Sequence, residues 1–172
     1  PELCFLLSTG TRTSAELVAR RAPPRTTHIY APLDRQDIVK SFFDHWRPDA
    51  GVFVESEVWP NLILEAVARN IPLALVNARM SPKTLSRWTL WRTAARRLLS
   101  AFQWVSAADG RTASVLTELS GENVANLGNL KLAAPAPLVD TASRDALAAE
   151  IGNRPVWLAA STHAGEDEIV LR

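Results

Sequence analysis

Short apolar runs alternate with amphipathic stretches along most of the chain, and this alternation predicts the fold. Val52 to Val54 and Pro72 to Val76 lack internal polar positions, which is typical of strands in a parallel sheet covered on both faces. The other predicted strands are Leu3 to Leu7, Thr27 to Tyr30, Trp104 to Ala107 and Val124 to Leu127. Because helical patterns separate these runs, we expect an α/β fold with a doubly wound parallel sheet.

Turn and capping residues indicate where the helices begin and end. Asp34 is a candidate N-cap, Pro60 suits a first helical turn, and Gly121 suits a helix C-terminus. The main predicted helices run from about Asp34 to Trp46, Val58 to Asn70, Ser81 to Ala101 and Gly110 to Leu119. The third of these is predicted as one long helix.

The composition changes after the sixth predicted strand. Residues 133–137 read AAPAP, a stiff proline-rich linker, and a helix from Thr141 to Ile151 and an apolar strand from Val156 to Ala160 follow. We therefore expect an N-terminal domain over residues 1–132, a linker and connecting helix over 133–154, and the start of a second α/β domain over 155–172. Since both ends lie directly against predicted elements, we expect the chain to be part of a longer protein.

Composition narrows the class of protein. A hydrophobic content of 47% with 22% charged residues is typical of globular domains. The net charge of +1 by itself says almost nothing about partners, and we expect no nucleic-acid partner. The single cysteine, Cys4, excludes an internal disulfide, and its apolar surroundings predict a small buried side chain. The sequence lacks metal-ligand spacing, a glycine-rich phosphate loop, a signal peptide and an apolar run of the roughly 18 residues that a membrane-spanning helix requires.

Two glutamates follow the third predicted strand. Glu55 comes directly after Val54, and Glu57 lies in the turn before a helix. Ligands of open α/β sheets bind at the carboxyl ends of strands, so Glu55 is a candidate general base, hydrogen-bond anchor or stabiliser of developing positive charge. For Glu57 the favoured interpretation is a carboxylate that stabilises the first turn of the helix.

Two further segments offer groups for an anion. Lys131 ends the GNLK motif at residues 128–131, next to the predicted linker. Two interpretations have equal weight here: a lysine that binds a phosphate or carboxylate, and a solvated lysine at a hinge. A loop between the last predicted strand and helix offers hydroxyl and N–H groups, although a helix cap is the simpler interpretation. That loop consists of Ser161, Thr162 and His163.

The segment from Arg79 to Arg97 is basic and contains tryptophan but no acidic residue. Basic helices of this composition bind anionic membrane surfaces, with tryptophan at the level of the headgroups. The alternative is a helix packed on the core whose arginines are solvated. We favour the membrane interpretation, and the residues expected at a membrane or lipid acceptor are Arg87, Trp88, Trp91, Arg92, Arg96 and Arg97.

Four motifs together resemble one family. They are ESEVWPNLI at residues 55–63, IPLALVNARMS at 71–81, GNLK at 128–131 and ASTHAGEDEIVL at 160–171. In order and spacing they resemble the 3-deoxy-D-manno-octulosonic acid (Kdo) transferases, over nearly the whole chain. The sequence departs from the family's pattern at Ala164, where an acidic residue is common, and at Leu132-Ala133, where an aromatic-acidic pair is common.

The resemblance implies a fold and an activity. It implies a two-domain GT-B glycosyltransferase with Rossmann-like domains, which transfers Kdo from CMP-Kdo to lipid A precursor in lipopolysaccharide biosynthesis. This would take place at the cytoplasmic face of the inner membrane, on an anionic surface, without a metal ion or other cofactor. Transition-state stabilisation is implied for Glu55 and Lys131, and substrate binding for Glu57, Arg79, Ser161, Thr162 and His163.

The resemblance also implies that some functional groups of the family lie outside residues 1–172. The family's general base is a glutamate in a Gly-Glu motif upstream of this sequence, and CMP-binding loops lie downstream of Arg172. We therefore expect the 172-residue chain alone to be inactive. Two alternatives remain: another GT-B enzyme such as a sugar-nucleotide epimerase, and a non-catalytic α/β domain that binds anionic lipid through residues 79–97.

Overall fold

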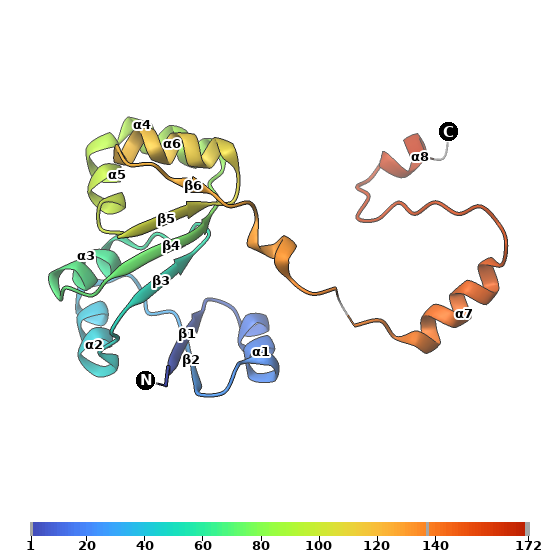
Figure 1. Cartoon of the computed structure of the whole chain (residues 1–172), viewed down its shortest axis with the longest axis horizontal. Helices are drawn as coiled ribbons and strands as arrows, with labels where there is room; N and C mark the ends of the chain where they lie inside the picture. The colour runs from blue at the N-terminus through green and yellow to red at the C-terminus, as the bar shows by residue number, and fades with distance from the viewer. Residues whose placement is uncertain (1, 137, 171–172) are drawn as a thin grey trace. The chain divides into compact units, whose positions relative to one another are not determined.

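The computed structural model describes residues 2–136 and 138–170, which form two compact units divided between Ala133 and Ala134 (Figure 1). The first unit alternates strands and helices, whereas the second contains two helices. The elements of the first unit are β1 (Phe5–Thr9), α1 (Arg12–Arg21), β2 (Thr26–Tyr30), α2 (Gln36–Trp46), β3 (Gly51–Val54), α3 (Pro60–Ala68), β4 (Leu73–Ala78), α4 (Pro82–Leu90), α5 (Arg92–Leu99), β5 (Trp104–Ala107), α6 (Gly110–Ser120), β6 (Ala125–Asn126) and the 3₁₀ helix η1 (Leu130–Ala133).

All strand pairs in the described residues are parallel, which confirms the predicted α/β class with strands and helices in alternation. The strands are divided over two sheets: β1 pairs with β2, and β3 to β6 form a second sheet in the order β3-β4-β5-β6. Parallel strands require crossovers, and the helices supply them. The carboxyl ends of β3 to β6 therefore meet at one edge of the sheet, which we call the carboxyl edge.

Helices α2, α3, α5 and α6 cover one face of the four-stranded sheet (Figure 1). Consecutive right-handed crossovers in one direction place their helices on the same side. The core lies between this helical layer and the sheet, and its fully buried side chains include Ile63, Leu75, Leu99 and Leu116. On the opposite face of the sheet, Val52 is 64% exposed.

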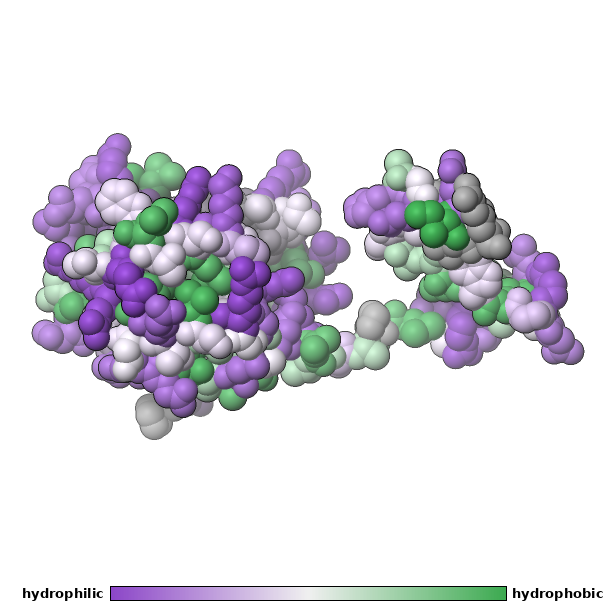
Figure 2. Space-filling view, turned by 90° about the horizontal axis from the view of Figure 1, so that it is seen from above, coloured by the Kyte–Doolittle hydropathy of each residue, from purple (hydrophilic) through white to green (hydrophobic). Residues whose placement is uncertain are grey.

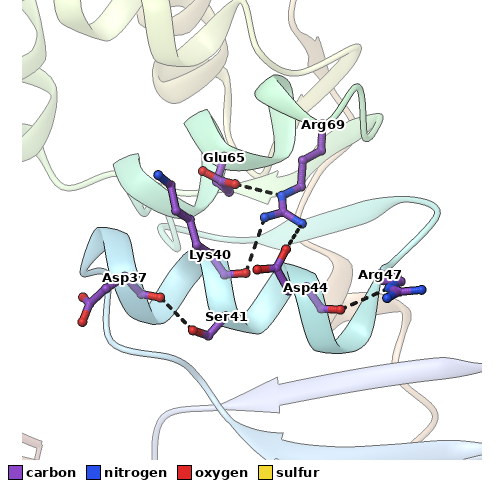
Figure 3. A network of polar contacts seen from close by, with 7 residues as sticks. All are labelled: Asp37, Lys40, Ser41, Asp44, Arg47, Glu65 and Arg69. Atoms are coloured by element: carbon purple, nitrogen blue, oxygen red, sulfur yellow. Dashed lines mark hydrogen bonds and ion pairs between the residues drawn. The ribbon is translucent and has the colours of Figure 1, made fainter.

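A polar network joins α2 to α3 (Figure 3). Arg69, at the C-terminus of α3, contacts Asp44 of α2 at 2.7 Å and Glu65 of its own helix at 2.8 Å. Its guanidinium also lies 5.6 Å from the centre of the Phe43 ring. Hydrogen bonds to Glu65 and Asp44 raise the pKa of Arg69, and its guanidinium links α2 to α3.

Asp34 caps a helix, but not the one predicted. The N-cap of α2 is Arg35, and the Asp34 carboxylate instead accepts the backbone N–H groups of Asn61 (3.1 Å) and Leu62 (2.9 Å) at the start of α3. Trp59, the N-cap of α3, makes no side-chain cap hydrogen bond. The backbone N–H groups in the first turn of α3 therefore need acceptors from another segment. Asp34 thus ties the loop after β2 to α3.

Three other predictions are wrong. The segment after Ser81 is not one helix but two, because the chain leaves helical geometry at Trp91 (φ −105°, ψ 41°). Cys4 is exposed rather than buried, since it lies ahead of β1 and outside the core. Residues 156–160 form no strand within the described part of the second unit, where no neighbouring strand is available for pairing.

The second unit contains α7 (Thr141–Ile151) and α8 (Glu166–Val170). Asp140 caps α7 by accepting the N–H of Ala142 at 3.1 Å, and Ser143 and the nearby backbone N–H groups lower the pKa of its carboxyl. The apolar residues Val156, Trp157 and Leu158 are all exposed, and this unit shows apolar surface in Figure 2. Over residues 2–136 and 138–170, no helix combines the length and apolar character needed to cross a bilayer.

Candidate functional site

The carboxyl edge collects polar residues from four separate loops. Each of these loops follows one strand of the four-stranded sheet, and parallel pairing brings all four to the same place. The residues concerned are Glu55 after β3, Asn77 and Arg79 at the end of β4, Asp109 after β5, and Asn129 and Lys131 after β6. Three of the four motifs found in the sequence therefore converge in space.

Glu55 and Lys131 form an ion pair at this edge. The Lys131 Nζ lies 2.8 Å from the Glu55 Oε1, with the glutamate side chain 35% exposed and that of the lysine 66% exposed. Ion pairs this accessible contribute about 0–1 kcal/mol to stability. The pair therefore contributes little to the stability of the fold. It does place one negative and one positive group together where a ligand can reach them.

Glu55 adopts a backbone conformation that is unusual for its residue type. Its φ is 60°, in the left-handed region, although its N–H still donates to the carbonyl of Val76 at 3.0 Å. A non-glycine residue in this region costs about 1–2 kcal/mol. Such strain is concentrated at functional positions, because the surrounding structure must enforce it.

Asn77 holds the loop that carries Lys131. Its side chain is buried, its Oδ1 accepts the N–H of Leu130 at 3.0 Å, and its Nδ2 donates to the side-chain Oδ1 of Asn129 at 3.3 Å. The same Asn129 oxygen accepts the N–H of Lys131 at 3.1 Å. Asn77 is also left-handed (φ 54°), and the β4–β5 register shifts beside it, as at a β-bulge. The bulge thus connects the end of β4 to the GNLK motif.

Arg79 and Asp109 lie at the same edge. Asp109 is the N-cap of α6, and the N–H of Thr112 (2.8 Å) together with its hydroxyl (2.9 Å) lowers the pKa of the Asp109 carboxyl. The guanidinium of Arg79 lowers this pKa further. The carbonyl of Arg79 accepts a hydrogen bond from the hydroxyl of Ser56, which fastens the loop after β3 to β4.

Replacing Asp109 by alanine is expected to lower the free energy of unfolding by about 1 kcal/mol at pH 7, because the N-cap of α6 is lost. The folded-state pKa of Asp109 lies below its ordinary value of 3.8, so its charge stabilises fully above that value. This contribution is lost as the pH falls through the folded-state pKa. Urea unfolding at pH 7 and at lower pH would measure it.

Asp109→Asn provides the control for charge. Asparagine is an equally good N-cap, so this variant should keep most of the stability at pH 7 but lose the pH dependence contributed by Asp109. If Asp109→Ala unfolds at the same urea concentration as the parent chain at pH 7, the cap is not stabilising.

Glu57 does not cap α3, contrary to the favoured interpretation of the sequence. It precedes the helix, and its Oε2 accepts the indole N–H of Trp59 at 2.6 Å. The N-terminal donors of α3 are instead bonded to Asp34, as described above. Glu57 is exposed close to Glu55 in the chain, and its predicted part in substrate binding stays a prediction.

The residues predicted at a membrane differ in their surroundings. Trp88 packs against the core, and Arg92 pairs with Glu118 of α6 at 2.8 Å. Arg96 and Arg97 line a cleft of about 590 Å³ between α5 and α6, together with Arg92, Ser100 and Glu118. Since α5 ends just before β5 begins, this cleft lies toward the amino ends of the strands. Arg87 and Trp91 are exposed.

The loop of Ser161, Thr162 and His163 belongs to the second unit. Ser161 is left-handed (φ 59°), the N–H of His163 donates to the Glu166 carboxylate at 2.9 Å, and the N–H of Glu166 donates to the His163 carbonyl at 3.0 Å. The carboxylate and the N–H of Glu166 thus both bond to the backbone of His163, which closes the loop onto the first residue of α8. All three residues are exposed, and their predicted proximity to a nucleotide stays a prediction.

The described residues contain no group of three or more histidine, cysteine, aspartate or glutamate side chains placed to hold a metal ion. The groups available at the carboxyl edge are the Glu55–Lys131 pair, the guanidinium of Arg79, the carboxylate of Asp109 and the amides of Asn77 and Asn129. An ammonium or guanidinium group can bind a phosphate or carboxylate, and a carboxylate can stabilise developing positive charge. The edge is thus equipped for a reaction that separates charge.

Comparison with known proteins identifies the family. The family model described as 3-deoxy-D-manno-octulosonic-acid transferase (kdotransferase) matches residues 1–134. The chain belongs to the Kdo transferase family. This confirms the resemblance seen in the four motifs, and the matched residues include the whole carboxyl edge with its glutamate–lysine pair.

Relatives with curated names agree. The chain is similar to the 3-deoxy-D-manno-octulosonic acid transferase of Rickettsia bellii, with 36% identity over 99% of the chain and 41% of that protein. It is 34% identical to the probable mitochondrial 3-deoxy-D-manno-octulosonic acid transferase of Arabidopsis thaliana and 32% identical to the transferase of Haemophilus influenzae, covering 40% and 41% of them. The chain therefore spans about two fifths of the length of these relatives.

Proposed function

We propose that the complete protein transfers Kdo from CMP-Kdo to a lipid A precursor, as a step of lipopolysaccharide biosynthesis at the cytoplasmic face of the inner membrane. The observation that supports this most directly is the Glu55–Lys131 contact at 2.8 Å. Two motifs far apart in the sequence meet there, in a chain that belongs to the Kdo transferase family. The donor sugar, the lipid A acceptor and the membrane location are proposed from the resemblance to that family rather than from the geometry.

The glutamate–lysine pair suits the charges of glycosyl transfer. When the bond between the anomeric carbon and the phosphate of the donor breaks, positive charge develops on the sugar ring and negative charge on the departing phosphate. The Glu55 carboxylate stabilises the first, and the Lys131 ammonium stabilises the phosphate or the carboxylate of the sugar acid. These groups act by electrostatics, and proton removal from the acceptor hydroxyl belongs to a group outside residues 1–172.

The remaining predicted residues have supporting roles in this proposal. Arg79 and Glu57, which follow β4 and β3 at the carboxyl edge, bind substrate, and Ser161, Thr162 and His163 contact the CMP donor in the assembled protein. We propose that the reaction needs no metal ion, because the Lys131 ammonium supplies the positive charge beside the departing phosphate that a metal would otherwise give.

The test is a transfer assay with the complete protein. CMP-Kdo and lipid A precursor are incubated with it in the presence of EDTA, and the mass of the lipid product is measured. A product heavier by one or more Kdo residues supports the proposal, and the isolated 172-residue chain should give none. If the complete protein binds the lipid but leaves CMP-Kdo and lipid unchanged, the non-catalytic alternative is correct.

A further inference from the structure

The junction of α4 and α5 exposes two large apolar side chains next to each other. Leu90 is 82% exposed and Trp91 is 73% exposed. Leu90 is the last residue of α4, and Trp91 is both the C-cap of α4 and the N-cap of α5. Because the chain turns here, both side chains protrude at a corner, which we call the Leu90–Trp91 corner.

The rest of α4 and α5 is anchored to the core. Leu85, Ala95 and Leu99 are buried, and Trp88 and Leu98 pack against the same core cluster. Among the large apolar side chains of α4, α5 and their junction, only those of the Leu90–Trp91 corner do not pack against the core. Burial of the neighbours on both sides fixes the corner in place, so its exposure is not the result of a loose segment.

The surface beside the corner is basic. Lys83 and Arg87 lie four residues apart on α4, and Leu90 and Trp91 follow Arg87 at three and four residues, so all four share one stripe of the helix. Lys83 and Arg87 are exposed. Among the described residues neither takes part in an ion pair, in contrast to Arg92, which is paired with Glu118. Residues 79–99 contain no acidic side chain.

We propose that the Leu90–Trp91 corner inserts into the headgroup region of an anionic phospholipid bilayer, with Lys83 and Arg87 bound to lipid phosphates. This rests on the membrane location in the proposed function and specifies which surface makes the contact. Tryptophan and leucine gain by burial at the interface, and each basic residue near an anionic surface strengthens binding about fivefold. The positive charges of Lys83 and Arg87 thus complement the anionic lipids, and the side chains of Leu90 and Trp91 insert into the bilayer.

Sedimentation with vesicles tests the proposal. The chain is mixed with vesicles of phosphatidylcholine containing phosphatidylglycerol, and with vesicles of phosphatidylcholine alone. The double variant Leu90→Ser/Trp91→Ser should bind the anionic vesicles at least tenfold more weakly than the parent chain, because the insertion is lost. The double variant Lys83→Gln/Arg87→Gln should bind them roughly 25-fold more weakly, and should differ little from the parent on neutral vesicles.

A matched control exists in the second unit. Trp157 (59% exposed) and Leu158 (87% exposed) form an adjacent pair of the same composition. Trp157→Ser/Leu158→Ser should bind as the parent does, and circular dichroism melting curves should show that all variants fold. Unchanged binding of Leu90→Ser/Trp91→Ser would overturn the proposal, as would an equal loss in the control. The vesicles contain neither donor nor acceptor, so a failure of Kdo transfer leaves this result unaffected.

Discussion

Replacing Glu55 by glutamine is expected to lower the kcat of Kdo transfer by the complete protein about 100- to 1,000-fold, the usual effect of removing one preorganised electrostatic group. Glutamine keeps the size of the side chain and removes its negative charge. The KM for CMP-Kdo should change much less, because the carboxylate acts on charge that develops only in the transition state. Steady-state kinetics with varied CMP-Kdo measures both quantities.

Glu57→Gln is the matched control for this experiment. Glu57 lies two residues away and is exposed, and its carboxylate is bonded to the indole of Trp59 rather than to Lys131. Its replacement should change kcat less than about tenfold, that is, by less than 1.4 kcal/mol of activation free energy. If Glu57→Gln abolishes transfer while Glu55→Gln remains active, the roles of the two carboxylates are reversed.

The backbone of Glu55 adds a second readout. Because its φ is 60°, glycine fits this position better than glutamate does. Glu55→Gly should therefore stabilise the fold by up to about 1 kcal/mol while it abolishes transfer. Higher stability with lost activity would show that the glutamate is retained for its chemistry, and it would separate this effect from misfolding.

Local patterns were enough to predict most of the first unit. The run Trp104 to Ala107 is strand β5, and Gly121 ends α6 with the left-handed geometry (φ 81°) that favours glycine. Such features depend on neighbouring residues in the chain. The division of the strands into two sheets could not be predicted, because sheet order depends on pairing between distant segments rather than on local periodicity.

The break between α4 and α5 had no local marker either. Neither glycine nor proline occurs between Lys83 and Leu99, so the sequence predicts one continuous helix. Leu85 of α4 and Leu99 of α5 are buried in the same core cluster. Residues 14 apart lie on the same face of a continuous helix as well, so this burial does not require the break. Trp91, where the chain leaves helical geometry, is exposed, whereas Trp88 of α4 is packed against the core.

The charged residues of the candidate site could be found in the sequence, but the contact between them and the residue that holds their loop in place could not. Glu55 and Lys131 were recognisable from their positions after strands, and their contact became visible only with the topology. Asn77 was missed as a site residue although it lies in the NAR motif, because asparagine in a strand gives no signal of a distant partner. The left-handed tendency of asparagine was the only local sign available.

Replacing Asn77 by glycine is expected to lower kcat/KM for Kdo transfer about 10- to 100-fold, because the loop that positions Lys131 loses its anchor. Glycine keeps the left-handed backbone (φ 54°) and removes both side-chain hydrogen bonds to Asn129 and Leu130. The N–H of Leu130 is then left without this partner, so the free energy of unfolding should fall by about 1–3 kcal/mol. Transfer assays and urea unfolding measure the two effects.

Two comparisons separate the hydrogen bonds from the backbone. Asn77→Ala should be less stable than Asn77→Gly by about 1–2 kcal/mol, since alanine is strained in the left-handed region. Asn70→Gly makes the same change at an exposed left-handed asparagine (φ 58°) after α3, and it should leave transfer unchanged. If Asn77→Gly transfers Kdo as fast as Asn70→Gly does, Asn77 does not position Lys131. A loss confined to Asn77→Gly would instead show that the side chain of Asn77 positions Lys131 through its hydrogen bonds to the GNLK loop.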